Sequence, residues 1–116
     1  MRLNEIVEVL DAELLVGKDS DINIYAACGS DLMSDVMAFV KENVALLTGL
    51  VNPQVIRTAE MMDIRLVIFV RGKVPTNEII DLAKSKGIAV MTTKLPMFIA
   101  CGKLYEAGVT GRGALE

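Results

Sequence analysis

Residues 66–91 read LVIFVRGKVPTNEIIDLAKSKGIAVM and contain a strand, a turn, a helix and a second strand. Residues 66–70 are continuously apolar, which is typical of a parallel strand covered on both faces. Residues 71–73 end this strand, and Thr76 is a suitable N-cap for the helix that follows. Gly87 closes the helix before the second apolar strand. The stretch therefore predicts two parallel strands joined through a right-handed helical crossover.

The same pattern recurs on both sides of this unit, at intervals of about 21 residues. Upstream we expect strands at 22–28 and 44–47, each followed by a helix, and Pro96 opens a last helix downstream. Residues 1–16 add a short helix and a further strand. The predicted fold is α/β, a single compact domain over 1–110 with a mainly parallel sheet flanked by helices. Residues 111–116 are assigned to a C-terminal tail, disordered or partly a cloning scar.

One of the upstream helices carries two acidic residues near its start. Ser30 is expected to cap it, and Val36, Met37 and Val40 belong to its apolar stripe. Asp31 and Asp35 are four positions apart on the same helix. Such a pair suits either a hard cation or a solvated first turn beside the positive end of the helix dipole.

Composition excludes several classes of protein. The 116-residue chain is 53% hydrophobic and 23% charged, the opposite of a disordered chain, and its net charge of −3 does not favour nucleic-acid binding. It has no His, the commonest general base and metal ligand, so we predict no catalytic activity, metal or cofactor. The sequence predicts neither a signal peptide nor a membrane span, so we expect a cytoplasmic protein. In that reducing compartment Cys28 and Cys101 are expected to be buried, inert thiols.

The loops that follow parallel strands gather at one edge of a sheet, and ligands bind there. This strand-end edge combines small residues, hydroxyl groups, three cations and helix N-termini, a combination that suits phosphate or carboxylate groups. The candidate ligand-binding residues are Thr48, Gly49, Asn52, Arg71, Gly72, Lys73, Thr92, Thr93 and Lys94. Alternatively the polar residues cap helices, the glycines serve turns and the cations are solvated, because every α/β fold forms such an edge.

Residues 46–108, LLTGLVNPQVIRTAEMMDIRLVIFVRGKVPTNEIIDLAKSKGIAVMTTKLPMFIACGKLYEAG, resemble a DRTGG domain, and the resemblance extends from residue 5. It is carried by the strand ends Thr48-Gly49 and Arg71-Gly72, by 82–90 and by 92–94. It implies a compact α/β accessory module, found beside CBS modules in some pyrophosphatases and in some phosphotransacetylases, and similar to the N-terminal domain of HPr kinase/phosphorylase. Such domains support dimer contacts and regulation. Leu50-Val51-Asn52 stands where the family has Asp-Arg, and Val70-Arg71-Gly72 stands in place of Thr-Gly-Gly.

Two hypotheses follow. The first is a regulatory module without catalytic activity that senses a nucleotide-like or other anionic ligand at the strand-end edge. The high apolar content of so small a domain, with seven Met, favours a homodimer. The second is a scaffold subunit of a redox or hydrogenase-related complex with no ligand of its own, because the stand-alone form resembles small proteins linked to such gene clusters in anaerobes.

Overall fold

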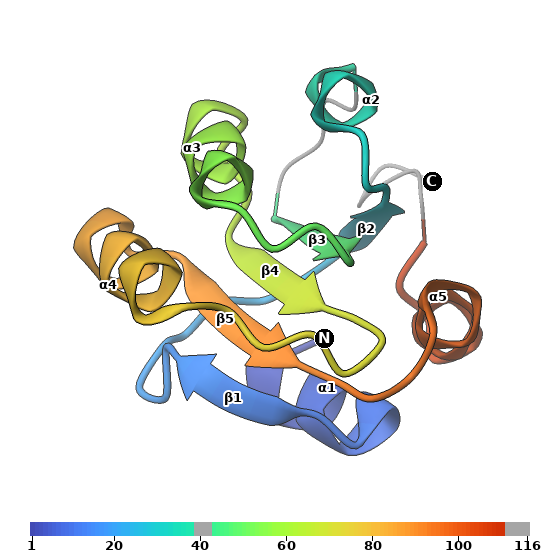
Figure 1. The fold of residues 1–116 in the computed structure, drawn as a ribbon. Helices are drawn as coiled ribbons and strands as arrows, with labels where there is room; N and C mark the ends of the chain where they lie inside the picture. Colours follow the sequence, from blue (N-terminus) through green and yellow to red (C-terminus); the bar gives the residue numbers. More distant parts are fainter. Residues whose placement is uncertain (39–42, 111–116) are drawn as a thin grey trace.

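The computed structural model describes residues 1–38 and 43–110. Five helices and five strands lie in these ranges (Figure 1). The strands are β1 (Glu13–Val16), β2 (Ala26–Gly29), β3 (Val44–Thr48), β4 (Leu66–Phe69) and β5 (Ala89–Thr92). The helices are α1 (Leu3–Leu10), α2 (Met33–Met37), α3 (Pro53–Met61), α4 (Asn77–Lys86) and α5 (Met97–Glu106).

The strands form one sheet in the order β1-β5-β4-β3-β2. The four strands from β2 to β5 are parallel, which confirms the prediction of a mainly parallel sheet. The exception is β1, which pairs antiparallel with β5 at one end of the sheet. The loops after β2, β3, β4 and β5 therefore open at the same edge, and β1 begins there.

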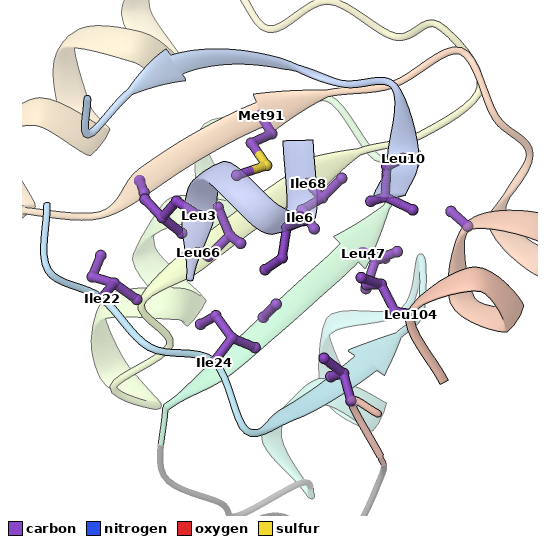
Figure 2. Close-up of a cluster of buried hydrophobic side chains, with 14 of the residues drawn as sticks. Leu3, Ile6, Leu10, Ile22, Ile24, Leu47, Leu66, Ile68, Met91 and Leu104 are labelled. Atoms are coloured by element: carbon purple, nitrogen blue, oxygen red, sulfur yellow. The ribbon is translucent and has the colours of Figure 1, made fainter. Parts of the chain in front are cut away.

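Helices cover both faces of the sheet (Figure 1). On one face α1 and α5 pack over an apolar cluster in which Ile6 and Leu104 meet the strand residues Leu47 and Ile68 (Figure 2). On the other face α2, α3 and α4 cover a second cluster. Neighbouring residues of a strand point to opposite faces, so Leu47 enters the first cluster whereas Leu46 enters the second. This double burial explains why the central strands are apolar at every position.

Three helix ends predicted from the sequence are confirmed. Asn52 caps α3, its Oδ1 accepting the Gln54 backbone N–H at 2.8 Å. Thr76 caps α4 in the same way through the Ile79 N–H at 3.3 Å, and Gly87 ends α4 with φ of 69°. These local signals fix where α3 and α4 begin, immediately beyond the strand-end edge.

The prediction for residues 22–30 was wrong in two respects. Only Ala26–Gly29 form the strand, because Ile24 donates its N–H to the Met1 carbonyl at 2.7 Å and runs beside the N-terminal segment instead. Ser30 does not cap α2, whose N-cap is Leu32. The Ser30 N–H donates to the Leu47 carbonyl at 3.0 Å, directly after the end of β2, and its side chain closes a turn with Leu32.

Two further sequence predictions concern the regions around 39–42 and 111–116. Met37 was expected on the buried stripe of α2 but is 45% exposed, and Val40 lies outside the described residues. The predicted tail, 111–116, also lies outside them. Just before it, Thr110 forms a parallel bridge with Ala26 and accepts the Ala27 N–H at 2.9 Å, so Thr110 lies beside the outer edge of β2. Within the described ranges, every helix is too short or too polar to cross a membrane.

Candidate functional site

The strand-end edge consists of the loops after the four parallel strands, at 30–32, 49–52, 70–76 and 93–96. Because these strands share one direction, the structure brings the loops together as the sequence predicts. All nine candidate residues lie at this edge or at the strand ends that lead into it, but they do not form one cluster. Thr48, Gly49 and Arg71 contact Asp31, whereas Gly72, Thr92, Thr93 and Lys94 line a hollow beside β5. The side chains of Asn52 and Lys73 belong to neither group.

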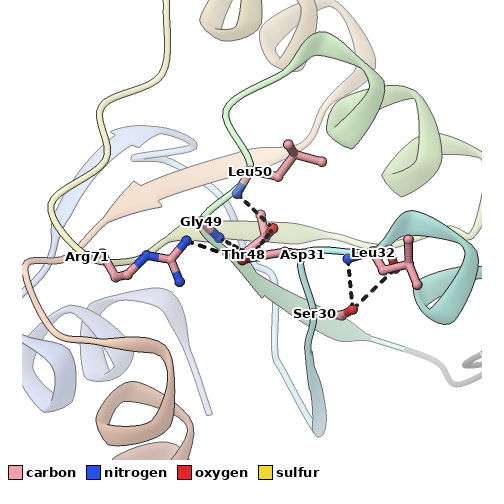
Figure 3. A network of polar contacts seen from close by, with 7 residues as sticks. All are labelled: Ser30, Asp31, Leu32, Thr48, Gly49, Leu50 and Arg71. Carbon is pink, nitrogen blue, oxygen red and sulfur yellow. Dashed lines mark hydrogen bonds and ion pairs between the residues drawn. The ribbon is translucent and has the colours of Figure 1, made fainter.

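Asp31 connects three of the four loops (Figure 3). Its Oδ1 accepts the Gly49 backbone N–H at 2.7 Å and the Thr48 hydroxyl at 3.1 Å. Its Oδ2 accepts from Nη2 of Arg71 at 3.2 Å. Thr48 is fully buried and also accepts the Leu50 N–H at 3.1 Å, so it anchors the network in the sheet. The strand ends of β2, β3 and β4 are thereby held together through one carboxylate.

The role of Asp31 was missed from the sequence. We weighed it as part of a cation-binding pair with Asp35 or as a solvated residue of a first helical turn, and neither describes it, because it precedes α2 and points across the sheet edge. The available signal was position, since Asp31 follows β2 as Gly49 follows β3 and Arg71 follows β4. The described residues contain no cluster of three or more His, Cys, Asp or Glu side chains placed to hold a metal ion.

These contacts stabilise the charged form of Asp31. The Gly49 N–H is the largest influence, and together with the Arg71 and Thr48 side chains it holds the pKa of the carboxyl below its usual value of 3.8. The side chains of Arg71 and Asp31 are 42% and 48% exposed. Solvent screens such a pair, so the ion pair itself contributes at most about 1 kcal/mol to folding.

Arg71 adopts an unusual backbone conformation, with φ of 61°. A left-handed conformation costs a non-glycine residue roughly 1–2 kcal/mol. It is held by the loop after β5, because the Arg71 N–H donates to Leu95 at 2.8 Å and the Gly72 N–H to Thr93 at 2.9 Å. These two N–H groups are therefore engaged within the protein, and the Arg71 guanidinium is the group presented at the edge.

Beside β5 lies a hollow of about 250 Å³. It is lined by Asp11, Ala12, Glu13, Gly72, Val74, Thr92, Thr93 and Lys94. The Thr92 hydroxyl donates to the Lys73 carbonyl at 2.6 Å, which ties the loop after β4 to this wall. The buried Thr93 hydroxyl donates to the Leu10 carbonyl at 2.8 Å, so this side chain supports the hollow from within.

Of the three candidate cations, only Arg71 has a carboxylate partner in the described part of the chain. The ammonium groups of Lys73 and Lys94 form no ion pair with any described residue. Asn52 lies at the same edge, but its side-chain oxygen caps α3. The alternative prediction, that all three cations are simply solvated, is therefore wrong for Arg71. It holds for Lys73 and Lys94.

The two cysteine side chains, Cys28 and Cys101, pack on opposite faces of the sheet. Cys28 packs with the cluster under α2 and α3, whereas Cys101 packs with the cluster on the opposite face of the sheet. Both are half-buried, and burial raises the pKa of each. The thiolate form, which is the nucleophile, is therefore disfavoured at neutral pH.

Comparison with known proteins gives one family and one informative fold. Chain residues 5–106 match the family model of the DRTGG domain. No curated protein matches the chain. A similar solved structure is that of the CBS and DRTGG domains of the regulatory region of Clostridium perfringens pyrophosphatase, complexed with its activator diadenosine tetraphosphate.

That structure is 22% identical in sequence, with a TM-score of 0.71. The match covers 93% of this chain but 47% of the other, so this chain corresponds to about half of that regulatory region. Likeness at this identity establishes the shared fold. Because the family model spans nearly all of the described residues, this chain belongs to the DRTGG domain family.

Proposed function

We propose that this chain is a regulatory module without catalytic activity that binds an anionic, nucleotide-like small molecule at the strand-end edge and acts as a homodimer. The observation that carries the proposal is that Arg71, Lys73 and Lys94 all follow the neighbouring parallel strands β4 and β5, at the same edge of the sheet. The bound activator of the pyrophosphatase regulatory region, a nucleotide, supports this choice of ligand class.

The contacts of Asp31 indicate how an anion would be recognised. A backbone N–H, a hydroxyl and a guanidinium surround its carboxylate, and proteins bind phosphate oxygens with the same three donor types. Asp31 therefore occupies a ready anion position. A ligand phosphate must either replace Asp31 at Arg71 or bind first at the two lysines, whose ammonium groups have no carboxylate partner among the described residues.

The size of the hollow limits how a nucleotide can lie. Pockets that enclose small molecules measure roughly 300–1,000 Å³, and the hollow beside β5 is about 250 Å³. Because Asp11 and Glu13 line it, the hollow suits an uncharged part of a nucleotide, while the phosphates would extend along the edge from Lys94 toward Arg71. Such a partly exposed mode suits a sensor that must release its ligand.

The proposed absence of catalysis rests on the available groups. The chain has no His to act as a general base. Burial raises the pKa of both thiols, which makes neither an activated nucleophile.

The proposal is tested by thermal unfolding with AMP, ADP, ATP and diadenosine tetraphosphate at millimolar concentrations. A ligand at 100 times its Kd adds about 2.7 kcal/mol to the free energy of unfolding, so the true ligand raises Tm by several degrees. Lys94→Ala and Lys73→Ala should reduce the shift, whereas Lys84→Ala on α4, away from the edge, should preserve it. If none of the four nucleotides changes Tm, the ligand proposal is wrong.

A scaffold subunit of a redox or hydrogenase-related complex is the second candidate. The observation in its favour is the exposed apolar face of α5, where Phe98 is 83% exposed. This function predicts that a partner protein co-purifies with the chain and that Arg71 and Lys94 variants retain the partner.

A further inference from the structure

Helix α5 presents an apolar stripe to solvent. Phe98 is 83% exposed and Tyr105 is 68% exposed, although the opposite side of the helix is buried at Ala100 and Leu104. Phe98, Gly102 and Tyr105 are separated by four and three positions, so they lie in line on the outer face. Two large aromatic side chains thus flank a glycine on the outside of the molecule.

Gly102 has no role that the described part of the chain explains. Its backbone is helical, and a Cβ added there would meet nothing within 4 Å. Gly49 differs, because a Cβ there would overlap the Arg71 guanidinium. Glycine in a helix interior is less favourable than alanine. What a missing side chain does permit is close approach of another backbone, which for an exposed helix means a second helix from outside.

The ends of α5 are complementary in charge to each other. Its N-terminus has no side-chain cap and no acidic residue in the first turn, so several N–H groups there remain without a helical partner. Glu106 is the last residue of the helix and forms no ion pair within the described ranges. A carboxylate is favourable at a helix N-terminus. An antiparallel copy of α5 would bring its Glu106 to that place.

The positions of these residues are also symmetric. Helix α5 runs from Met97 to Glu106, so its midpoint lies between Cys101 and Gly102. Phe98 and Tyr105 are equally far from this midpoint, as are Met97 and Glu106. In an antiparallel pair about that point, each Phe98 faces the partner subunit's Tyr105, and the two Gly102 residues lie at the crossing.

We propose that the chain docks on a second copy of itself through antiparallel pairing of α5 about a two-fold axis beside Gly102. This deepens the homodimer part of the proposed function by naming its surface, and it does not depend on the ligand. Ten residues of helix extend about 15 Å. One face of so short a helix buries less surface than a standard interface, which covers about 800 Å² per partner. The dimer is therefore expected to be weak and reversible, so that its fraction rises with protein concentration.

The test is sedimentation velocity of the full chain, without nucleotide, from micromolar to millimolar concentration. The wild type should shift from monomer to dimer. Phe98→Glu and Gly102→Glu should each raise the dimer Kd at least tenfold. Gly102→Glu places two like charges beside the axis, whereas Phe98→Glu removes an aromatic contact and places a carboxylate near the partner subunit's Glu106. Met61→Glu is the matched control, since Met61 is 62% exposed on α3, across the sheet from α5, and its change should alter Kd less than twofold.

The Gly102→Glu variant also distinguishes an effect on dimer formation from an effect on folding. Because the site is open within the described structure and glutamate favours helix more than glycine does, this variant should raise Tm of the monomer while it weakens the dimer. A wild type that stays monomeric at millimolar concentration overturns the inference, as does a dimer that tolerates both glutamate variants.

Nucleotide binding is measured separately, as the change in Tm that the nucleotides cause in the Phe98→Glu variant. If the dimer forms as described but no nucleotide shifts Tm, the ligand proposal fails alone. If Phe98→Glu keeps a nucleotide shift while the wild type never dimerises, the docking inference fails alone.

Discussion

The Arg71 guanidinium lies against the Gly49 backbone, where any other residue would carry its Cβ. From that position its Nη2 reaches Asp31 at 3.2 Å. The glycine at the end of β3 therefore determines where the arginine at the end of β4 can rest.

Gly49→Ala should displace Arg71 without disrupting the fold. The overlapping atoms belong to the end of a flexible side chain, which can swing away, so the cost is the lost ion pair, about 1 kcal/mol or less. Urea unfolding measures the change. In an Arg71→Ala background the same substitution should cost nothing further, and a full additional loss would show that Gly49 has another role.

Arg71→Gly should be less destabilising than Arg71→Ala by about 1 kcal/mol. Both variants lose the contact with Asp31, but only glycine adopts φ of 61° without strain. The two free energies of unfolding are compared under the same conditions. Equal values would mean that the loop relaxes to a different conformation once the arginine is gone.

Asp31→Asn should increase affinity for an anionic ligand at the strand-end edge. The substitution removes the charge that competes for Arg71 while an oxygen remains to accept from Gly49 and Thr48. Calorimetric titration with the nucleotide that raises Tm most should show a several-fold lower Kd. Asp35→Asn, on α2, is the control and should leave Kd unchanged. Weaker binding by Asp31→Asn would assign the carboxylate to the ligand site itself.

The stability contributed by Asp31 should depend on pH in one direction. Its pKa in the folded state lies below the usual 3.8, so the folded protein favours the ionised form more than the unfolded chain does. That contribution is fully present above pH 3.8 and is lost as pH falls through the lower folded value. The wild type should thus exceed Asp31→Asn in urea midpoint at pH 6, and the difference should shrink below pH 4. A constant difference would exclude the carboxylate charge as its source.

The sequence was sufficient for features that depend on neighbouring residues. Asn52, Thr76 and Gly87 were recognised because a cap or a helix end is decided within a few positions. The parallel sheet followed from continuous apolar strands, as in 66–70. The resemblance to the DRTGG family was likewise confirmed over 5–106.

Features that depend on distant segments were missed. Asp31 contacts Gly49 and Arg71, which lie 18 and 40 positions away, so its own surroundings in the sequence gave no sign of the network. The strand expected at 22–28 was shortened by the N-terminal segment, which pairs with Asn23 through Arg2. The antiparallel direction of β1 depends likewise on pairing with β5, the last strand of the sheet in chain order.

The bridge between Thr110 and Ala26 has a consequence for how the protein avoids self-aggregation. β2 is an edge strand with small side chains, and an unprotected edge strand can pair with a strand of another molecule. The Thr110 carbonyl accepts the outward-pointing N–H of Ala27, so this backbone donor cannot pair with another molecule. A truncation before Val109 would remove Thr110 and expose the edge of β2 to pairing with further copies of the chain. Such a variant should aggregate, although it would retain all the helices and strands described above.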